Sequence, residues 1–415
     1  RRDLHPAKME GGFMFPLERV ENTTRGLLRY SSLPLHGSVR ENGYYYTNLQ
    51  LGSPPKNFAV IMDTGSTITY VPCKECGHSC GSNHVGEAFD KAASTTFEDV
   101  MCSTPNCLTN ECHTISGNRY CYYSRYYAED SSSAGLIISD HMAFNDGQDG
   151  VQVIFGCELQ ESGEIYNQEA DGIMGLGSAS VSIIDQLADA GVIDDAFSLC
   201  YGAIEGGGVL ILGDPPLPEW IGEIQWTPMK TSSAHPTYYI ATLESWKVGT
   251  RTLQVAKSVW AMGHGVVFDS GTTFTYIPTA AFNAFASAVD QQVQGLTKVD
   301  GPDPQYEDIC YSGAPTDTTR LAEVFPTMAV TFLDNMVLDL DPVQYLFAHT
   351  RIAGAYCLGV FDYGYGGTLL GGVTTRNTLI KYDRKNRRIG VVKADCHRLK
   401  GTALPAYASP PPCPP

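Results

Sequence analysis

Basic residues are scarce in this chain. Lys and Arg number 28 against 45 Asp and Glu, so the 415 residues carry a formal net charge of −17 at pH 7. This balance argues against nucleic acid or an anionic membrane surface as a partner. The chain also has no run of 18 or more apolar residues, and we therefore expect no membrane span within it.

Motifs of two other enzyme classes are missing. The chain has no His-Glu-x-x-His helix and no Gly-rich loop that could hold a phosphate. Its ten His residues are scattered along the sequence and form no obvious ligand set. We therefore predict that the protein uses no metal and no organic cofactor.

Cysteine, in contrast, is abundant. Of the 13 cysteines, seven fall between Cys73 and Cys121. Cys73 and Cys76 could open a zinc site, but no second close pair follows at the distance that such a site needs. Disulfides in a secretory-pathway protein are the better interpretation. The sequon at Asn22 is compatible with that compartment and predicts glycosylation there.

The chain is long enough for two lobes, and its pattern is mostly that of β-strands. Residues 43–63 predict two strands around a Gly-Ser-Pro-Pro turn. Helical periodicity is confined to a few stretches, of which 182–193 and 279–293 are the clearest, the second with Thr279 as its cap. An all-β-dominated protein with a few short helices is expected.

One decapeptide occurs twice. Asp63–Pro72 reads DTGSTITYVP and Asp269–Pro278 reads DSGTTFTYIP, with six of the ten positions identical. Duplicated lobes related by a pseudo-twofold axis could bring Asp63 and Asp269 face to face. Two carboxylates at hydrogen-bonding distance cannot both ionise easily, so one keeps a proton while the other is charged. Such a pair can deprotonate a water and protonate a carbonyl.

At these residues the chain resembles the pepsin-like aspartic proteases (peptidase family A1), over roughly residues 40–397. It is most similar to the plant branch that includes the nepenthesins and the plant aspartic proteinase-like membrane-associated proteins. The stretches 170–177 and 368–373 resemble the strands that pass beside each catalytic loop. The resemblance implies a bilobal fold of two pseudo-twofold-related β lobes with a cleft between them.

The resemblance also assigns roles to residues around the two aspartates. Gly65 and Gly271 would permit the tight catalytic loops. Thr64 and Ser270 would form a hydrogen-bonded grip between the loops, and Ser66 and Thr272 would bond the outer carboxylate oxygens. A flap would close over the substrate, and the residues expected to contact substrate are Tyr127, Ser131, Tyr70 and Thr273.

Two disulfides follow from the resemblance: Cys310 with Cys357, and Cys200 with Cys396. Connectivity within the cluster stays open. Because thirteen is odd, Cys413 in the Pro-rich tail is expected to be left over. The cysteines expected in disulfides are Cys73, Cys76, Cys80, Cys102, Cys107, Cys112, Cys121, Cys157, Cys200, Cys310, Cys357 and Cys396.

We divide the chain into an N-terminal segment of propeptide character (1–40), an N-terminal lobe (41–225), a C-terminal lobe (226–397) and a Pro-rich tail (398–415). The start is expected to be processed, and a membrane anchor could follow the residues given. The predicted function is that of a monomeric, secreted or anchored acid endopeptidase, made as a zymogen, that cleaves proteins or peptides through Asp63 and Asp269. The alternative is a catalytically inactive binding or inhibitor protein on the same fold.

Overall fold

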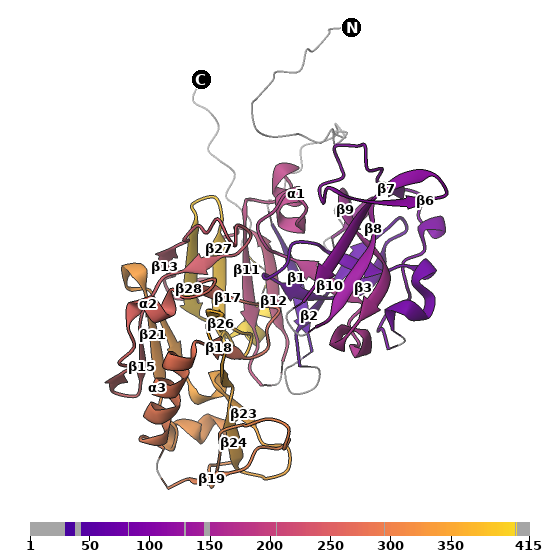
Figure 1. Cartoon of the computed structure of the whole chain (residues 1–415). Helices are drawn as coiled ribbons and strands as arrows, with labels where there is room; N and C mark the ends of the chain where they lie inside the picture. The colour runs from indigo at the N-terminus through magenta and orange to yellow at the C-terminus, as the bar shows by residue number, and fades with distance from the viewer. Residues whose placement is uncertain are drawn as a thin grey trace, which may run out of the picture.

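The computed structural model describes residues 30–37, 43–81, 83–127, 130–144, 150–204, 206–293, 295–402 and 404. Strands dominate, and they gather into two lobes that lie side by side (Figure 1). The predicted bilobal, β-dominated pepsin-like fold is confirmed. No helix among the described residues is long and apolar enough to cross a membrane. Asn22 and Cys413 lie outside the described residues.

The N-terminal lobe is built on one long sheet. Its two expected strands in 43–63 are present as β2 and β3, joined by the predicted turn. The lobe's strands are β1 (Tyr30–His36), β2 (Tyr46–Leu51), β3 (Lys56–Asp63), β4 (Tyr70–Pro72), β5 (Glu98–Asp99), β6 (Glu111–Ile115), β7 (Asn118–Tyr126), β8 (Ser132–Ala143), β9 (Val151–Ser162), β10 (Gly172–Gly175), β11 (Ala196–Tyr201) and β12 (Gly208–Gly213).

The C-terminal lobe holds three smaller sheets and contributes strands to the long one. Its strands are β13 (Gln225–Pro228), β14 (Ile240–Ala241), β15 (Leu243–Val248), β16 (Arg251–Thr252), β17 (Val266–Phe268), β18 (Thr275–Ile277), β19 (Thr297–Val299), β20 (Cys310–Ser312), β21 (Met328–Phe332), β22 (Val337–Leu340), β23 (Leu346–Ala348), β24 (Ala355–Leu358), β25 (Val360–Asp362), β26 (Thr368–Leu370), β27 (Thr378–Asp383) and β28 (Arg388–Lys393).

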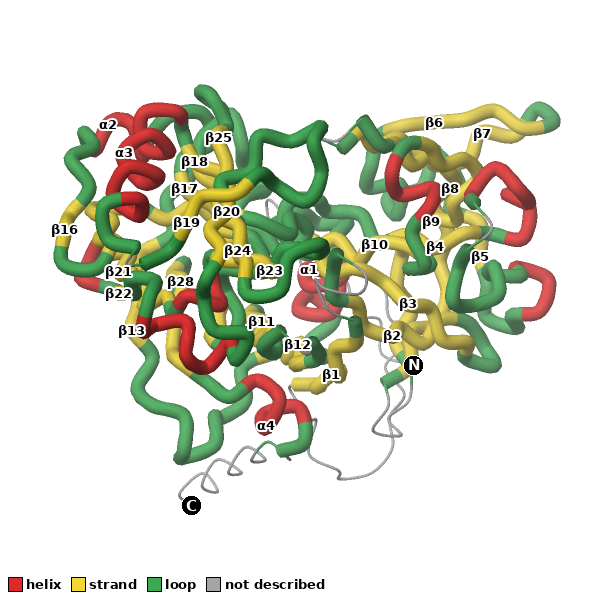
Figure 2. Tube along the Cα trace, turned by 90° about the horizontal axis from the view of Figure 1, so that it is seen from below, coloured by secondary structure: helices red, strands yellow, loops and turns green. Residues whose placement is uncertain are grey.

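The helices are short and peripheral. They are α1 (Ile183–Asp189), α2 (Lys257–Trp260), α3 (Thr279–Asp290) and α4 (Cys396–Lys400). Figure 2 shows α2 and α3 at the end of the molecule opposite β6 to β9. The expected helices are present, but Thr279 is not the cap of α3. The N-cap position is Pro278, and the Thr279 hydroxyl donates to Asp362 instead, at 2.7 Å.

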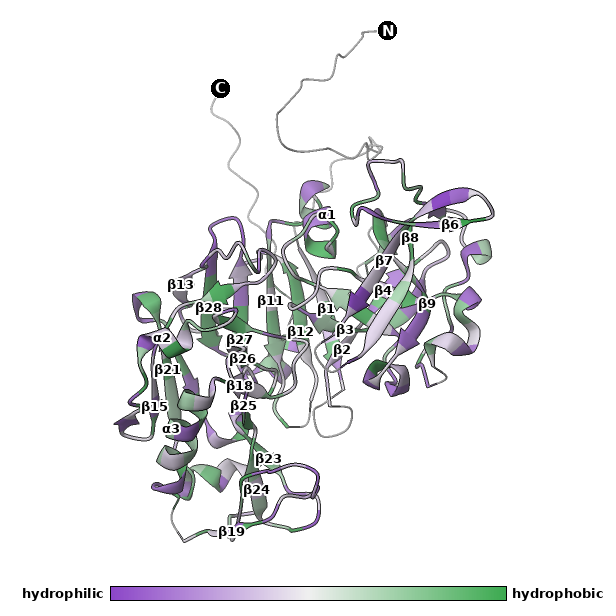
Figure 3. Cartoon of the chain, in the orientation of Figure 1, coloured by the Kyte–Doolittle hydropathy of each residue, from purple (hydrophilic) through white to green (hydrophobic). Residues whose placement is uncertain are grey.

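One sheet joins the lobes. Strand β11 of the first half pairs antiparallel with β27 of the second half, from Ala196 opposite Asp383 to Cys200 opposite Leu379. Every residue of β11, β12 and β27 is buried, and Figure 3 shows the shared sheet as mainly hydrophobic. Burial of this apolar sheet between the halves fixes the lobes relative to each other.

The two decapeptides sit in equivalent places. Strand β3 runs parallel to β10, with Asp63 opposite Gly175, and β4 lies antiparallel on the other side of β10. In the second lobe, β17 runs parallel to β26, and β18 lies antiparallel on its other side. Tyr70 and Tyr276 occupy the same position in these two arrangements. The duplication read from the sequence is therefore a duplication of structure.

Strand β10 crosses the catalytic loop of the first lobe, and the end of β26 crosses that of the second. A glycine is required at each crossing. A Cβ at Gly175 would overlap the backbone at Ile68, and a Cβ at Gly371 would overlap the backbone oxygen of Phe274. Ile68 and Phe274 occupy the same position of the decapeptide. The close approach lets Gly177 donate to the Ser66 carbonyl at 2.8 Å, and in the second lobe Gly372 donates to the carbonyl of Thr272, the counterpart of Ser66, at 2.8 Å.

Strand β1 lies within the segment 1–40 that the sequence suggested to be of propeptide character. It pairs with β12 along Tyr30 to Leu35, and its end pairs with β2. Residues 30–36 are thus part of the joining sheet, and a truncation that tests the propeptide prediction should leave them in place.

Six disulfides account for all twelve cysteines among the described residues. The predicted pairs Cys310–Cys357 and Cys200–Cys396 are both formed. The cluster, whose connectivity the sequence left open, pairs as Cys73–Cys157, Cys76–Cys80, Cys102–Cys112 and Cys107–Cys121. The sulfurs of Cys73 and Cys76 are therefore used in separate disulfides, which overturns the zinc alternative. Six disulfides are consistent with a protein of the secretory pathway.

Candidate active site

Asp63 and Asp269 approach each other between the lobes. Asp63 is the last residue of β3, and Asp269 directly follows β17. A Cβ placed on Gly65 would lie 3.1 Å from Oδ1 of Asp63 and 3.3 Å from Oδ1 of Asp269. A Cβ on Gly271 would overlap the Asp63 carboxylate. Both carboxylates therefore reach the same small region, and only glycine leaves them room there.

Each carboxylate is oriented by the loop that carries it. The backbone N–H of Gly65 donates to Oδ1 of Asp63 at 2.8 Å, and that of Gly271 donates to Oδ1 of Asp269 at 3.1 Å. The Thr272 hydroxyl donates to Oδ2 of Asp269 at 2.7 Å, as its position in the motif suggests. Asp63 is 7% exposed, so its carboxylate is held in a largely dry environment.

Thr64 and Ser270 link the two loops by four hydrogen bonds. The N–H of Thr64 donates to Oγ of Ser270 at 2.9 Å, and the N–H of Ser270 donates to Oγ1 of Thr64 at 3.0 Å. Each hydroxyl then donates to a carbonyl of the opposite strand, Phe268 at 2.9 Å and Met62 at 2.8 Å. The structure thus brings together the two residues that the resemblance paired.

Ser66 does not take the position that the resemblance implied. Its Oγ is inaccessible and has no hydrogen-bond partner in the described part of the chain, whereas Thr272, its counterpart, bonds Asp269. The two halves of the site therefore differ in the support that they give to the outer carboxylate oxygen.

This difference supplies a matched test of the grip. Thr64→Val keeps the shape of a buried side chain but removes two hydrogen bonds and leaves the Ser270 N–H without its acceptor. We expect a loss of about 2–4 kcal/mol in the free energy of unfolding. Ser66→Ala should change it by less than about 0.5 kcal/mol. Denaturant unfolding of both variants checks this, and equal losses would contradict the assigned role of Thr64.

A buried layer that the sequence analysis missed lies beneath the aspartates. Tyr201 donates to the carbonyl of Ser270 at 3.5 Å and stacks on Tyr45 with ring centroids 4.4 Å apart. Arg376, 4% exposed, donates to Oη of Tyr45 at 3.3 Å. Burial raises the pKa of Tyr201, so its phenol stays neutral. In the sequence these residues stand among apolar neighbours, as many core residues do. No sequence signal therefore separates them from the rest of the core.

A second missed residue is Tyr238. Burial, and then the charges of Asp269 and Asp63, raise the pKa of its phenol. The carbonyl of the preceding Thr237 accepts a hydrogen bond from Ser178 at 2.9 Å, so this C-terminal segment contacts the first lobe.

Tyr127 lies at the end of the hairpin β7–β8, where the flap was predicted. Its Oη donates to Oη of Tyr70 at 3.3 Å, so two of the residues predicted to contact substrate contact each other. The neighbouring Tyr126 is 83% exposed and points away, as strand alternation predicts. Tyr70 is fully buried among aromatic side chains and supports Tyr127 from below.

Two residues that were predicted to contact substrate have hydroxyl groups that are hydrogen-bonded within the protein in this structure. Ser131 is fully buried, and its Oγ accepts from the backbone N–H groups of Glu164 and Ile165 at 3.0 and 3.4 Å. In this structure the Ser131 hydroxyl holds the start of a 3₁₀ turn, and its contact with substrate stays a prediction. Thr273 donates to the carbonyl of Gly43 at 2.6 Å, so its hydroxyl is also engaged in the structure.

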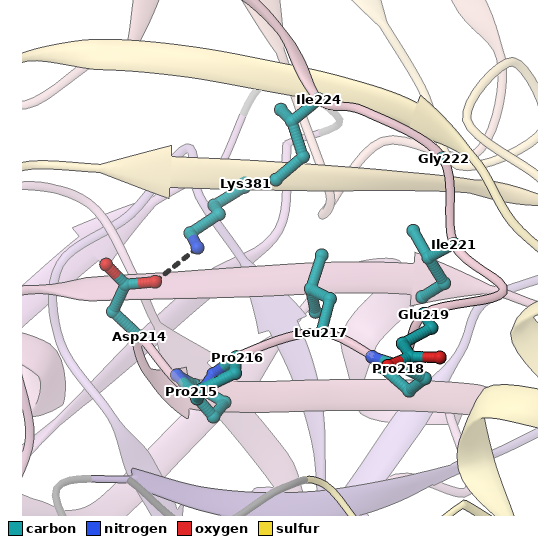
Figure 4. Close-up of a pocket in the computed structure, with 10 residues that line it drawn as sticks. All are labelled: Asp214, Pro215, Pro216, Leu217, Pro218, Glu219, Ile221, Gly222, Ile224 and Lys381. Atoms are coloured by element: carbon teal, nitrogen blue, oxygen red, sulfur yellow. Dashed lines mark hydrogen bonds and ion pairs between the residues drawn. The ribbon is translucent and has the colours of Figure 1, made fainter. Parts of the chain in front are cut away.

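A pocket of about 420 Å³ lies elsewhere, under the loop that follows β12 (Figure 4). Its lining comes from residues 214–224 and from Lys381, which pairs with Asp214. No residue predicted for the active site lines it. Apart from this ion pair and Glu219, its lining consists of prolines, aliphatic side chains and a glycine.

Comparison with known families gives matches in both halves of the chain. A family described as xylanase inhibitor N-terminal matches residues 45–214, and one described as xylanase inhibitor C-terminal matches residues 237–393.

Individual plant proteins are similar over most of their length. Aspartic proteinase 39 of Arabidopsis thaliana is 30% identical over 394 residues, which cover 89% of this chain and 78% of that protein. Aspartic proteinase nepenthesin-1 of Nepenthes gracilis is 28% identical, covering 86% and 78%. Among solved structures, edgp matches with a TM-score of 0.71 at 17% identity (91% of this chain, 98% of that one), and basic 7S globulin from soybean with 0.68 at 18% (89% and 98%). These structures support the fold alone.

Proposed function

Because this chain belongs to the pepsin-like family that includes the plant aspartic proteinases, we propose that it is an aspartic endopeptidase active at acidic pH. The observation that carries the proposal is the meeting of Asp63 and Asp269 around Gly65, each oriented by its own loop. The enzyme would act as a monomer on protein or peptide substrates.

In the proposed reaction the two carboxylates share one proton and hold a water between them. The charged carboxylate takes a proton from this water as its oxygen bonds to the peptide carbonyl carbon. The protonated carboxylate gives its proton to the carbonyl oxygen, which yields a neutral tetrahedral intermediate. Breakage of the C–N bond then requires a proton at the leaving nitrogen, which the carboxyl that took it from the water supplies, while the other carboxylate takes a proton from one hydroxyl of the intermediate. Low pH favours this chemistry because one proton must stay on the pair.

The direct test is digestion of a denatured protein over a range of pH, with cleavage sites identified by mass spectrometry. We expect endoproteolysis that is greatest in acid, falls toward neutral pH and is insensitive to a chelator. A peptide that carries a hydroxyl in place of the attacked carbonyl should bind tightly, because it occupies the position of the water. Activity that a chelator abolishes would refute the proposal.

The alternative is an inactive binding protein, and the description of the matching families as xylanase inhibitors favours testing it. Such a protein would bind a xylanase without cleaving any substrate. Both Asp-Thr/Ser-Gly motifs are intact here, and Tyr127 is present at the hairpin, which supports the peptidase. A xylanase-inhibition assay beside the digestion assay separates the two functions.

A further inference from the structure

Two glutamates of strand β9 face the same side of the sheet because its pairing with β8 is irregular. Gly135 pairs with Glu158, but the adjacent Ala134 pairs with Gln160, so β9 holds one extra residue there. Such a bulge reverses the alternation of faces beyond it. Glu158 and Glu161 are consequently both buried, whereas Gln160 between them is exposed.

Both carboxyl groups lack the partners that ionised groups need. Glu158 is fully buried and Glu161 is 8% exposed. Neither oxygen of Glu158, nor Oε2 of Glu161, has a hydrogen-bond partner among the described residues. The Ser133 hydroxyl lies beside Glu158 and eases its ionisation slightly, but it is not placed to hydrogen-bond it. A bare carboxylate is very unfavourable in such a place, so the structure suits the protonated form.

The pair lies beside the turn end of the hairpin β7–β8, the end that carries Tyr127, because Glu158 is opposite Gly135 near the start of β8. Glu161 is the cross-strand partner of Ser133, and the Ser133 hydroxyl shares a hydrogen bond of 3.0 Å with Tyr123 of β7. Tyr123 stacks on Tyr70 with ring centroids 5.8 Å apart, and Tyr70 bonds Tyr127. One packed group therefore connects the carboxyl pair to the candidate active site.

The basic side chain beside the carboxyl pair is that of His84. Its Nδ1 faces the Ala170 carbonyl at 3.1 Å, and its Nε2 faces the Cys80 carbonyl. Both ring nitrogens of His84 thus face backbone carbonyl oxygens rather than either glutamate. The charge of His84 also acts on Asp171, whose carboxylate accepts from the backbone N–H groups of Ala59 in β3 and of Gly86.

The titration of these groups follows from their surroundings. Burial raises the pKa of Glu161 to about 7, against the opposing effect of the His84 cation. Burial, and then the charge of Glu161, raise the pKa of Glu158 well above its ordinary range. Burial also raises the pKa of Tyr70 and Tyr123, so both phenols stay neutral and add no negative charge of their own. Ionisation of the first glutamate thus puts a negative charge beside a second acid in a dry site.

We propose that protonation of Glu158 and Glu161 holds the hairpin β7–β8 in its packed position, and that its loss above neutral pH loosens the hairpin and sets the upper pH limit of activity. The claim about the upper pH limit of activity rests on the proposed peptidase function. The claim that the hairpin loosens does not. A buried pair that must hold protons would confine the packed hairpin to acidic conditions.

The test compares the wild type with Glu161→Gln, Glu158→Gln and, as control, Glu164→Gln, which changes an exposed glutamate next to the cluster. Glutamine has the shape of a protonated glutamate and cannot ionise. Amide hydrogen exchange in residues 118–143, corrected for the intrinsic effect of pH, should rise at least about threefold between pH 6 and pH 8 in the wild type and the control. It should rise clearly less in Glu161→Gln, and the upper limb of the pH–activity profile should move up by about one unit.

Glu158→Gln should act in the same direction, so the test survives if one variant fails to fold. Identical exchange and identical upper pH limits in Glu161→Gln and Glu164→Gln would overturn the proposal. If no form cleaves substrate at any pH, the proposed function fails while hydrogen exchange still decides the question of the hairpin. If Ca²⁺ alone protects the wild-type hairpin at pH 8 and a chelator reverses this, the pair is a cation site and the proposal is wrong.

Discussion

Asp63→Asn and Asp269→Asn should each lower peptide cleavage by at least about 10³-fold, because removal of a positioned acid or base forfeits its whole contribution to proton transfer. Asparagine keeps the shape of the side chain and can still accept from the N–H of Gly65 or Gly271. It cannot take a proton from water or give one to a carbonyl. The two losses should be far from additive, because the pair acts as one unit.

The matched control is Asp339→Asn, which changes an exposed aspartate of β22 in the C-terminal lobe and should leave cleavage unchanged. Unfolding curves must show that both active-site variants keep their fold. Cleavage that survives in both would mean that the repeated decapeptide has been misread. If the wild type is itself inactive but binds a xylanase, the alternative function stands instead.

The core of the site could be predicted because it is duplicated. The sequence repeats a decapeptide, and the strands around Asp63 and Asp269 repeat its geometry down to the crossing glycines Gly175 and Gly371. Such a crossing tolerates no side chain, so glycine is forced and visible in the sequence. The Thr64–Ser270 grip is visible for the same reason, since each half needs a small hydroxyl at one position.

Features that depend on local register could not be predicted. Strand alternation places residues three apart on opposite faces, and only the bulge in β9 brings Glu158 and Glu161 together. The buried position of Ser131 depends on the turn at Glu164, and the pairing inside the cysteine cluster depends on how β6 meets β7. None of these leaves a mark in composition or spacing.

Stability should fall as pH rises from about 4.5 to about 7, and the fall should be clearly shallower in Glu161→Gln. The pKa of Glu161 is raised by burial from 4.5 to about 7 in the folded protein. Between these values the folded chain keeps a proton that the unfolded chain has already released. The free energy of unfolding therefore drops by about 1.4 kcal/mol per pH unit, or about 3 kcal/mol in all. Below about pH 4.5 this group adds no pH dependence to the free energy of unfolding, because both states hold its proton. Above about pH 7 the loss of stability from this group is complete.

Denaturant unfolding at half-unit steps of pH checks this, best in an Asp63→Asn background that cannot digest itself. Glu158, whose pKa is also raised by burial, should add to the fall from about pH 4.5 upward in the same direction. Glu161→Gln should therefore remove about 1.4 kcal/mol per pH unit from the slope up to about pH 7, while Glu164→Gln keeps the wild-type slope. A slope of opposite sign would mean that Glu161 is ionised and paired in the folded protein, and His84 would then be its counterion. A protein whose buried acids must hold protons is most stable where its proposed chemistry also needs a proton, so stability and activity would share one pH range.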